Sequence, residues 1–213
     1  MNQLLGNMDP ALQLMLLMAG LSLLPFLLVS MTSFMRYVIV LSILKTALGT
    51  QQVPPGVVLV GISLLMTIYT MAPVFGEMYE RTEGPIARKE NIVVVMGEAS
   101  VPLKDFMMRQ TRQDDLAYIL ELGRKTPPET PEEVQIWEVA PAFIISELRT
   151  SFEIGFLIFI PFIVLDMVVA NILLALGMMM LSPTIISLPF KILIFIAVDG
   201  WSIIIHGLLQ SFN

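Results

Sequence analysis

The chain has 213 residues and a formal net charge of −6, and 14% of its residues are charged, against about 25% in an average soluble domain. Its mean hydropathy of +0.81 is typical of a membrane protein. The sequence contains no cysteine, which excludes disulfides and thiolate metal sites, and the single His206 cannot form a histidine cluster. The acidic balance and the lack of a basic stripe exclude a nucleic-acid-binding surface.

Three apolar runs make up most of residues 1–75. The first, residues 11–29, is about long enough to cross a bilayer, and Pro25 within it predicts a kink or a re-entrant shape. No basic segment precedes this run and no small-residue cleavage site follows it, so we expect it to be retained. The third run, residues 57–75, follows a turn at residues 49–56 that is rich in glycine and proline. The pattern predicts helical hairpins joined by tight turns.

The second run, residues 34–48, carries two basic side chains near its ends, Arg36 and Lys45. It is short for a membrane span. Long basic side chains at the ends of an apolar helix can bury their stems and extend the charged group into water. We therefore expect both residues to reach the surface.

Residues 76–140 hold 13 of the 18 acidic and 8 of the 12 basic residues. A block of mixed charge most often forms a solvated face, so this segment is predicted to be water-exposed and helical. Ser100 is a good N-cap with Pro102 in the first turn, and apolar residues recur at helical spacing until Gly123. These signals predict one amphipathic helix over residues 100–123.

A second helix is predicted to follow a proline-rich linker. Thr130 and Glu133 have the spacing of a capping box, and Pro131 suits the first helical position. We therefore expect this helix to begin at Thr130 or Pro131.

Residues 141–213 return to an apolar character. The run 142–181 begins amphipathic, and three charged residues lie near its start, namely Glu147, Arg149 and Glu153. Arg149 and Glu153 are four residues apart, a spacing that allows an ion pair. Farther along, the charged residues within the apolar runs are Asp166, Lys191 and Asp199.

These three charges would be destabilising in an apolar environment. A charge near the centre of a bilayer costs about 2.5 kcal/mol or more, so we expect them to face protein or water, with Lys191 as counter-ion of one of the two aspartates. One interpretation is an ion pair that fixes helix packing, and the other is a proton or ion pathway. We favour packing because a single basic partner and no chain of histidines or glutamates is a poor relay.

Catalysis is not expected. Asp166 and Asp199 could form the carboxylate pair of an intramembrane protease, but neither lies in a Gly-x-Gly-Asp context. No phosphate-binding loop occurs either. We predict a protein that is not an enzyme and has no cofactor or metal.

A glycine, three methionines and a Ser-Pro pair occupy residues 177–183. Gly177 and Pro183 are expected to break the helices on either side. Met178, Met179 and Met180 would then lie on a loop, where flexible thioethers could form a soft apolar seal. The alternative is that these methionines fill core space at a hairpin turn.

Several short sequence blocks, in the order in which they occur, resemble those of the FliP/SctR family. Members of this family form the core of the export gate of type III secretion systems. The blocks are residues 32–34 (TSF), 47–55 (ALGTQQVPP), 102–116 (PLKDFMMRQTRQDDL), 141–155 (PAFIISELRTSFEIG), 175–183 (ALGMMMLSP), 186–191 (ISLPFK) and 198–201 (VDGW). The resemblance covers nearly the whole chain and looks more flagellar than injectisome.

This resemblance implies an all-α protein whose helical hairpins assemble into a multi-subunit helical pore in the bacterial inner membrane, with much of the gate on the periplasmic side. It implies several copies of the chain, about five, in a closed arrangement, together with Q-type and R-type subunits, the B-type switch subunit and the large A-type export protein. The exported substrates would be unfolded proteins. Met178, Met179 and Met180 fall on the family's methionine-rich gasket at the pore constriction.

The sequence thus divides into N-terminal apolar hairpins (1–75), a polar helical segment (76–140) and a C-terminal hairpin with the methionine-rich loop (141–213). The alternative function is an ion-coupled transporter or channel for small solutes, with Asp166, Lys191 and Asp199 along an ion path. The internal repeats of such transporters are not visible in the sequence.

Overall fold

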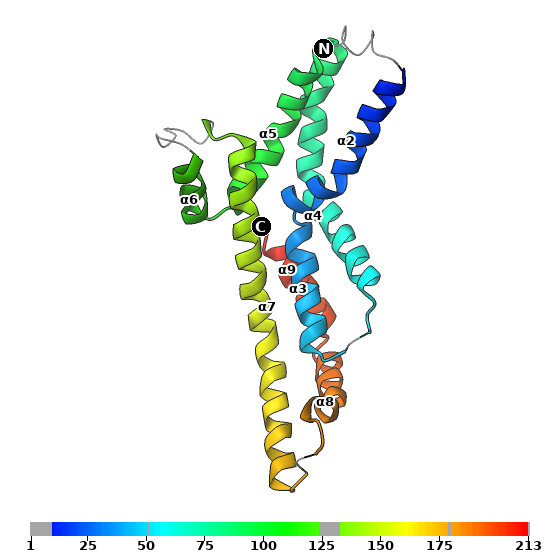
Figure 1. Cartoon of the computed structure of the whole chain (residues 1–213), viewed down its shortest axis with the longest axis vertical. Coiled ribbons are helices and arrows are strands. Elements are labelled where there is room, and N and C mark those ends of the chain that lie inside the picture. The colour runs from blue at the N-terminus through cyan, green and yellow to red at the C-terminus, as the bar shows by residue number, and fades with distance from the viewer. Residues whose placement is uncertain (1–9, 51, 124–132, 179, 213) are drawn as a thin grey trace. The chain divides into compact units, whose positions relative to one another are not determined.

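The computed structural model describes residues 10–50, 52–123, 133–178 and 180–212, and all regular structure in these ranges is helical. The all-α prediction is confirmed (Figure 1). The helices are α2 (Pro10–Met31), α3 (Phe34–Ala47), α4 (Gly56–Ala87), α5 (Ile92–Gln110), α6 (Gln113–Gly123), α7 (Ile136–Ala175), α8 (Pro183–Ala197) and α9 (Gly200–Gln210).

The chain forms two compact units, each of which uses separate stretches of sequence. Unit 1 comprises Met1–Ser33 and Ile68–Glu147, and unit 2 comprises Phe34–Thr67 and Leu148–Asn213. Helices α4 and α7 contribute residues to both units. Both helices also run through the borders drawn from composition at residues 75 and 140, so the three sequence segments do not end where helices end. The three-segment division stays a prediction.

Unit 2 is built around α3. The side chains of Tyr37, Val40, Leu41 and Leu44 are fully buried on this helix, at the three- and four-residue spacing of a helix whose one face meets the core. The cluster around them takes Phe162 from α7 and further residues from other helices, namely Leu59 and Met66 of α4, Phe195 of α8 and Leu208 of α9. α3 is therefore the central element of this unit.

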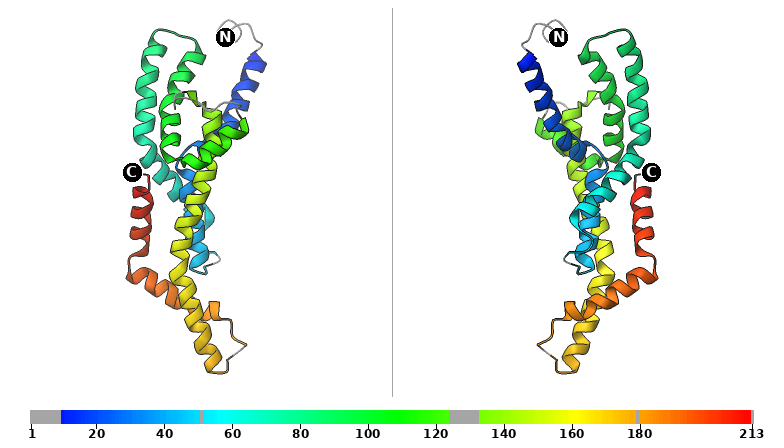
Figure 2. Two further views of the ribbon diagram at one scale, coloured as in Figure 1. Left: turned by 90° about the vertical axis from the view of Figure 1, so that its left-hand side faces the viewer. Right: turned by 90° about the vertical axis from the view of Figure 1, so that its right-hand side faces the viewer.

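Two glycines in unit 2 allow the backbone to lie close to a neighbouring side chain. A Cβ atom added to Gly155 of α7 would lie 2.4 Å from Cδ1 and 3.2 Å from Cβ of Ile43 on α3. A Cβ atom at Gly200 would lie 2.3 Å from the ring of Phe195. Gly200 follows the corner between α8 and α9, where the chain bends by 64° (Figure 2).

Unit 1 contains the hairpin of the C-terminal part of α4 with α5. The predicted helix start at Ser100 is wrong, because α5 begins at Ile92 and the side chain of Asn91 caps it by accepting from the backbone N–H of Val93 at 3.2 Å. Pro102 lies inside the helix. The residue that caps the helix is the asparagine nine residues before Ser100.

The single amphipathic helix predicted over residues 100–123 is in fact two helices. α5 ends at Gln110 and α6 covers Gln113–Gly123, and the residues directly after Gly123 lie outside the described ranges. The break is stabilised by tertiary hydrogen bonds: the backbone N–H of Arg112 donates to Ser146 Oγ at 3.0 Å, and that hydroxyl donates to the buried carboxylate of Asp115 at 2.8 Å. A contact with α7 thus replaces a helical turn.

The helix start predicted at Thr130 or Pro131 lies outside the described residues. α7 begins at Ile136, and Glu138 accepts from the backbone N–H of Gln135 at 2.8 Å, which is half of a capping box. Pro141 and Pro161 both lie within this helix of 40 residues.

Two helices in the described part of the chain, Gly56–Ala87 and Ile136–Ala175, are long and apolar enough to cross a membrane. The pair Pro183–Ala197 and Gly200–Gln210 meets the same criteria if it is taken together as one broken span. The apolar composition inferred from the sequence is therefore concentrated in elements of membrane-spanning length.

Candidate pore loop and buried polar network

The loop at residues 176–182 begins with a well-formed helix end. Gly177 has φ +74, in the left-handed region that favours glycine. Its N–H donates to the carbonyl of Leu174 at 3.0 Å, and the N–H of Met178 donates to the carbonyl of Leu173 at 2.9 Å. These two bonds form a Schellman motif, which closes α7 and satisfies two of its last carbonyls.

The far side of the loop is equally defined by local sequence. Ser182 precedes α8 in an extended conformation, and Pro183 occupies the start of the helix, where its fixed φ is compatible with the helix and its missing N–H costs nothing. Gly177 and Pro183 therefore stand at the two ends of the loop, so its bounds follow from backbone chemistry.

The loop presents apolar side chains that the described chain leaves half or fully exposed. Met180 is fully exposed and Met178 is 46% exposed. Met179 lies outside the described residues. Leu176 and Leu181 are also exposed. Neither of the two described methionines fills core space, so the gap-filling alternative does not fit their placement in the single chain.

A buried polar network joins three helices of unit 2. Lys191 on α8 is 3% exposed, and its ammonium donates to Asp166 Oδ2 on α7 at 2.7 Å and to the carbonyl of Ala47 on α3 at 3.1 Å. Ser187, one helical turn before Lys191, donates to the other carboxylate oxygen of Asp166. The expected counter-ion of Lys191 is therefore Asp166 and not Asp199.

The network is stabilised by its geometry as well as by its charges. Removing one partner of a buried ion pair commonly costs about 3–5 kcal/mol, because the other charge is left uncompensated. The carbonyl of Ala47 belongs to the last turn of α3, where the negative end of the helix dipole favours a cation. Lys191 thus fixes α8 to α7 and to the end of α3 at once.

Asp199 is placed differently from the other two charges. It is exposed and has φ 53 and ψ 51, a left-handed conformation that aspartate tolerates better than most residues. Its side chain makes no capping hydrogen bond. The turn between α8 and α9 leaves Asp199 on the surface of the single chain, so of the three charges expected to face protein or water, Asp199 faces water and takes no part in the ion pair.

The burial of Arg36 also differs from the prediction that its side chain reaches the surface. The side chain is 2% exposed and donates to the backbone carbonyl of Ser211 at 2.7 Å and to its hydroxyl at 2.9 Å. The guanidinium carbon lies 3.6 Å from the ring centroid of Phe212, in cation–π contact. Arg36 therefore does not extend into water but holds the end of α9, whereas Lys45 is half-buried.

The three charges near the start of the last apolar segment do not share one environment. Glu147 is fully buried, whereas Arg149 and Glu153 are exposed. The sequence analysis missed Ser187 and the carbonyl of Ala47 as network members. The serine has a detectable signal, since it lies four residues before Lys191 and shares its helix face, but the carbonyl has none.

Across the described ranges, no group of three or more histidine, aspartate or glutamate side chains is placed to hold a metal ion. The candidate site is thus an exposed methionine loop beside an internally satisfied polar network.

The comparisons with known proteins give the following matches. The family model described as the FliP family matches residues 17–208. The chain is 46% identical over 207 residues to the flagellar biosynthetic protein FliP of Bacillus subtilis, covering 97% of this chain and 94% of that protein. It is 44% identical over 203 residues to the FliP of Pectobacterium carotovorum (95% and 79% covered) and 38% identical over 211 residues to that of Aquifex aeolicus (98% and 88% covered). With a match of this length and identity, the chain belongs to the FliP family.

Proposed function

We propose that this chain is the core pore-forming subunit of the flagellar type III export gate. Several copies, together with Q-type and R-type subunits, enclose a channel through which unfolded proteins cross the bacterial inner membrane. The B-type switch subunit and the large A-type export protein complete the apparatus. The observation that carries the proposal is the exposed methionine loop, fixed between the Schellman end of α7 and the proline start of α8.

The loop has the properties that a compliant seal requires. Met178 and Met180 are exposed in the single chain, so copies arranged around one axis could bring their thioethers together. An apolar constriction can block ions by dewetting. Methionine is unbranched and deformable, so the same ring can open for a polypeptide.

The length of α7 supports a gate that extends beyond the bilayer. Its 40 residues span about 60 Å at 1.5 Å per residue, roughly twice the 30 Å of a hydrocarbon core. The helix also contains two prolines and Asp166. Such features are tolerated where a helix is buried in protein, which fits a complex that lies partly on the periplasmic side of the membrane.

The polar network has a structural role in this proposal. Lys191 donates to both Asp166 and the carbonyl of Ala47, so its charge is already compensated within the unit. A closed network that joins three helices suits assembly better than proton transfer, which needs a continuous chain of groups. This argues against the ion-coupled transporter.

The proposal is tested by the mass of the complex extracted in mild detergent from cells that express the full set of gate subunits. We expect a species containing several copies of this chain together with the Q-type and R-type subunits. A monomer or dimer without those subunits contradicts the proposal and favours a transporter.

A further inference from the structure

Two opposite charges in unit 2, Lys45 and Asp199, have no partner among the described residues. The cations of Lys191 and Arg36 are bound within the unit. Lys45 makes no ion pair within 4.0 Å in the described chain, and Asp199 makes neither an ion pair nor a capping hydrogen bond there. Unpaired charges in apolar helices are costly once they leave water.

The packing of α3 against α9 places these two charges at the same level. The two helices run in opposite directions within unit 2 (Figure 1), and Arg36 near the start of α3 holds Ser211 at the end of α9. From the contact between Arg36 and Ser211, α3 continues toward its C-terminus and α9 runs back toward its N-terminus, each over eleven residues or about 16 Å. The start of α9 is therefore level with the last turn of α3. Lys45 lies in that turn and Asp199 directly precedes α9.

A groove runs along the outer face of α3. It has a volume of about 360 Å³ and is lined by Val38, Ile39, Ser42, Ile43 and Thr46 of α3 with Phe152 and Phe159 of α7. Lys45 does not line the groove. It follows Val38 and Ser42 at seven- and three-residue spacing and the core residue Leu41 at four-residue spacing, so it lies at the border between the groove and the core face, near the end of the groove. The face of α3 that meets α9 in the same chain is a different one, formed by Tyr37, Val40, Leu41 and Leu44.

The outer face of α9 has the shape and charge to occupy such a groove. Asp199, Ile203, His206 and Gly207 share an exposed face at helical spacing. A Cβ atom at Gly207 would meet nothing within 4 Å, so another helix can approach closely there, as small residues allow in apolar surroundings.

Resting on the proposed function, which requires several copies of the chain, we infer that α9 of one copy docks in the α3–α7 groove of the next copy, with Asp199 beside the neighbour's Lys45. A rotation about an axis parallel to α3 keeps both charges at the same height. The two surfaces are different patches of one chain, so the contact is head-to-tail and can close into a ring. Charge complementarity also fixes the register of the contact.

Cysteine cross-linking in the assembled gate tests the contact, because the chain has no native cysteine. In the Lys45→Cys/Asp199→Cys variant, mild oxidation should produce a ladder of disulfide-linked copies. Cells that express differently tagged Lys45→Cys and Asp199→Cys chains should yield dimers that carry both tags. The control pairs Lys45→Cys with Leu193→Cys, an exposed α8 position, and should give no ladder.

Charge reversal provides a second readout that does not depend on disulfide geometry. Lys45→Glu or Asp199→Lys alone should reduce the amount of assembled complex about tenfold, and the double reversal should restore it, as expected for a specific pair. Restoration by the double variant supports the contact. Single variants that assemble like wild type contradict it.

The outcomes separate this inference from the proposed function. If the extracted complex has the mass of a multi-copy gate but the cysteine pair forms no links between chains, the contact is wrong and the gate proposal stands. If the wild-type chain does not assemble with itself or with gate subunits, both fail.

Discussion

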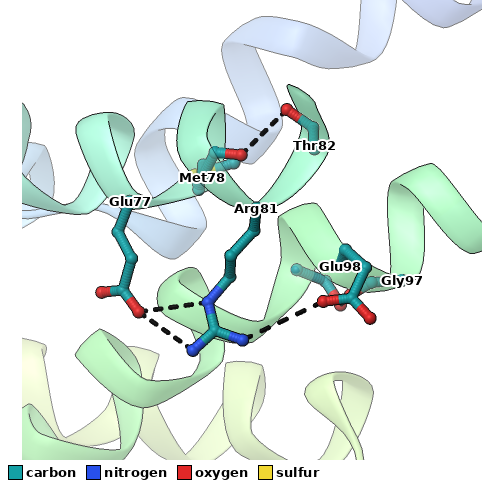
Figure 3. A network of polar contacts seen from close by, with 7 residues as sticks. Glu77, Met78, Arg81, Thr82, Gly97 and Glu98 are labelled. Carbon is teal, nitrogen blue, oxygen red and sulfur yellow. Dashed lines mark hydrogen bonds and ion pairs between the residues drawn. The ribbon is translucent and has the colours of Figure 1, made fainter. Parts of the chain in front are cut away.

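Unit 1 and unit 2 both place a basic side chain against a carboxylate, but every side chain of the first group is exposed to water, whereas the cation of the second is buried and only its carboxylate reaches water. In unit 1, Arg81 donates to Glu77 one turn earlier at 3.1 Å and lies 3.9 Å from Glu98 on α5 (Figure 3). These side chains are 40–50% exposed. In unit 2, Lys191 is 3% exposed and binds Asp166, which is 31% exposed, at 2.7 Å.

The difference in solvent access changes what each ion pair contributes. Exposed pairs contribute about 0–1 kcal/mol, because water and salt screen the charges and the side chains lose entropy. A buried pair makes a small net contribution when it is intact but is costly to break. The surface charges of unit 1 are therefore tolerant of change, whereas the few charges of unit 2 specify how its helices pack.

The largest effect is expected for Lys191→Met. The substitution keeps much of the side-chain volume but leaves Asp166 and the carbonyl of Ala47 without their cation. We expect a loss of about 3–5 kcal/mol in the free energy of unfolding of the detergent-extracted protein, measured by denaturant titration. A loss below about 1 kcal/mol would show that Lys191 is not structurally required.

A steric test follows from the contact between α3 and α7. Gly155→Ala places a Cβ atom 3.2 Å from Cβ of Ile43, a contact that rotation of the isoleucine side chain cannot relieve. We expect a loss of about 1–3 kcal/mol and partial rescue by Ile43→Ala. Gly61→Ala is the matched control, since nothing lies within 4 Å of its added Cβ and alanine is the better helix former. Equal effects of the two glycine variants would contradict the close packing.

The end of α7 offers a conformational test of smaller size. Gly177→Ala meets no neighbouring atom, so its cost comes from the left-handed backbone alone and should be about 1–2 kcal/mol. Gly177→Asn should cost less, because asparagine enters that region more readily. Thermal unfolding of the three proteins measures the order. If alanine and asparagine are both neutral, the Schellman end is not a constraint.

The smallest effect is expected for Arg81→Met in unit 1. It removes the contacts with Glu77 and Glu98, yet we expect a change of no more than about 0.5 kcal/mol, and high salt should erase it. Unfolding in low and high salt provides the measurement. A salt-independent loss comparable to that of Lys191→Met would remove the contrast between the units.

The sequence predicted those structural features that depend on residues close together in the chain. Gly177 and the Ser182–Pro183 pair mark helix ends through backbone chemistry, and the all-α architecture follows from long apolar runs. The start of α5 was missed because Ser100 and Pro102 resemble a helix start, while Asn91 performs that role.

Long-range partners could not be read from the chain. Asp166 lies 25 residues from Lys191 and Ala47 lies 144 residues away, and nothing in the sequence distinguishes Asp166 from Asp199 as the counter-ion. Arg36 likewise looked like a surface cation at a helix end, because its contact with Ser211 spans 175 residues. The roles of charged residues in apolar segments depend on tertiary contacts that only the folded chain supplies.

The central claim concerns the exposed methionine loop, and ion conductance through the purified gate tests it most directly. The triple variant Met178→Ala/Met179→Ala/Met180→Ala removes volume from every copy at once, whereas the leucine triple variant keeps an apolar group of similar size. With assembly verified by mass, we predict that membranes containing the alanine gate conduct small ions and that those with the leucine gate stay tight. An alanine gate that assembles fully and remains impermeable would contradict the claim.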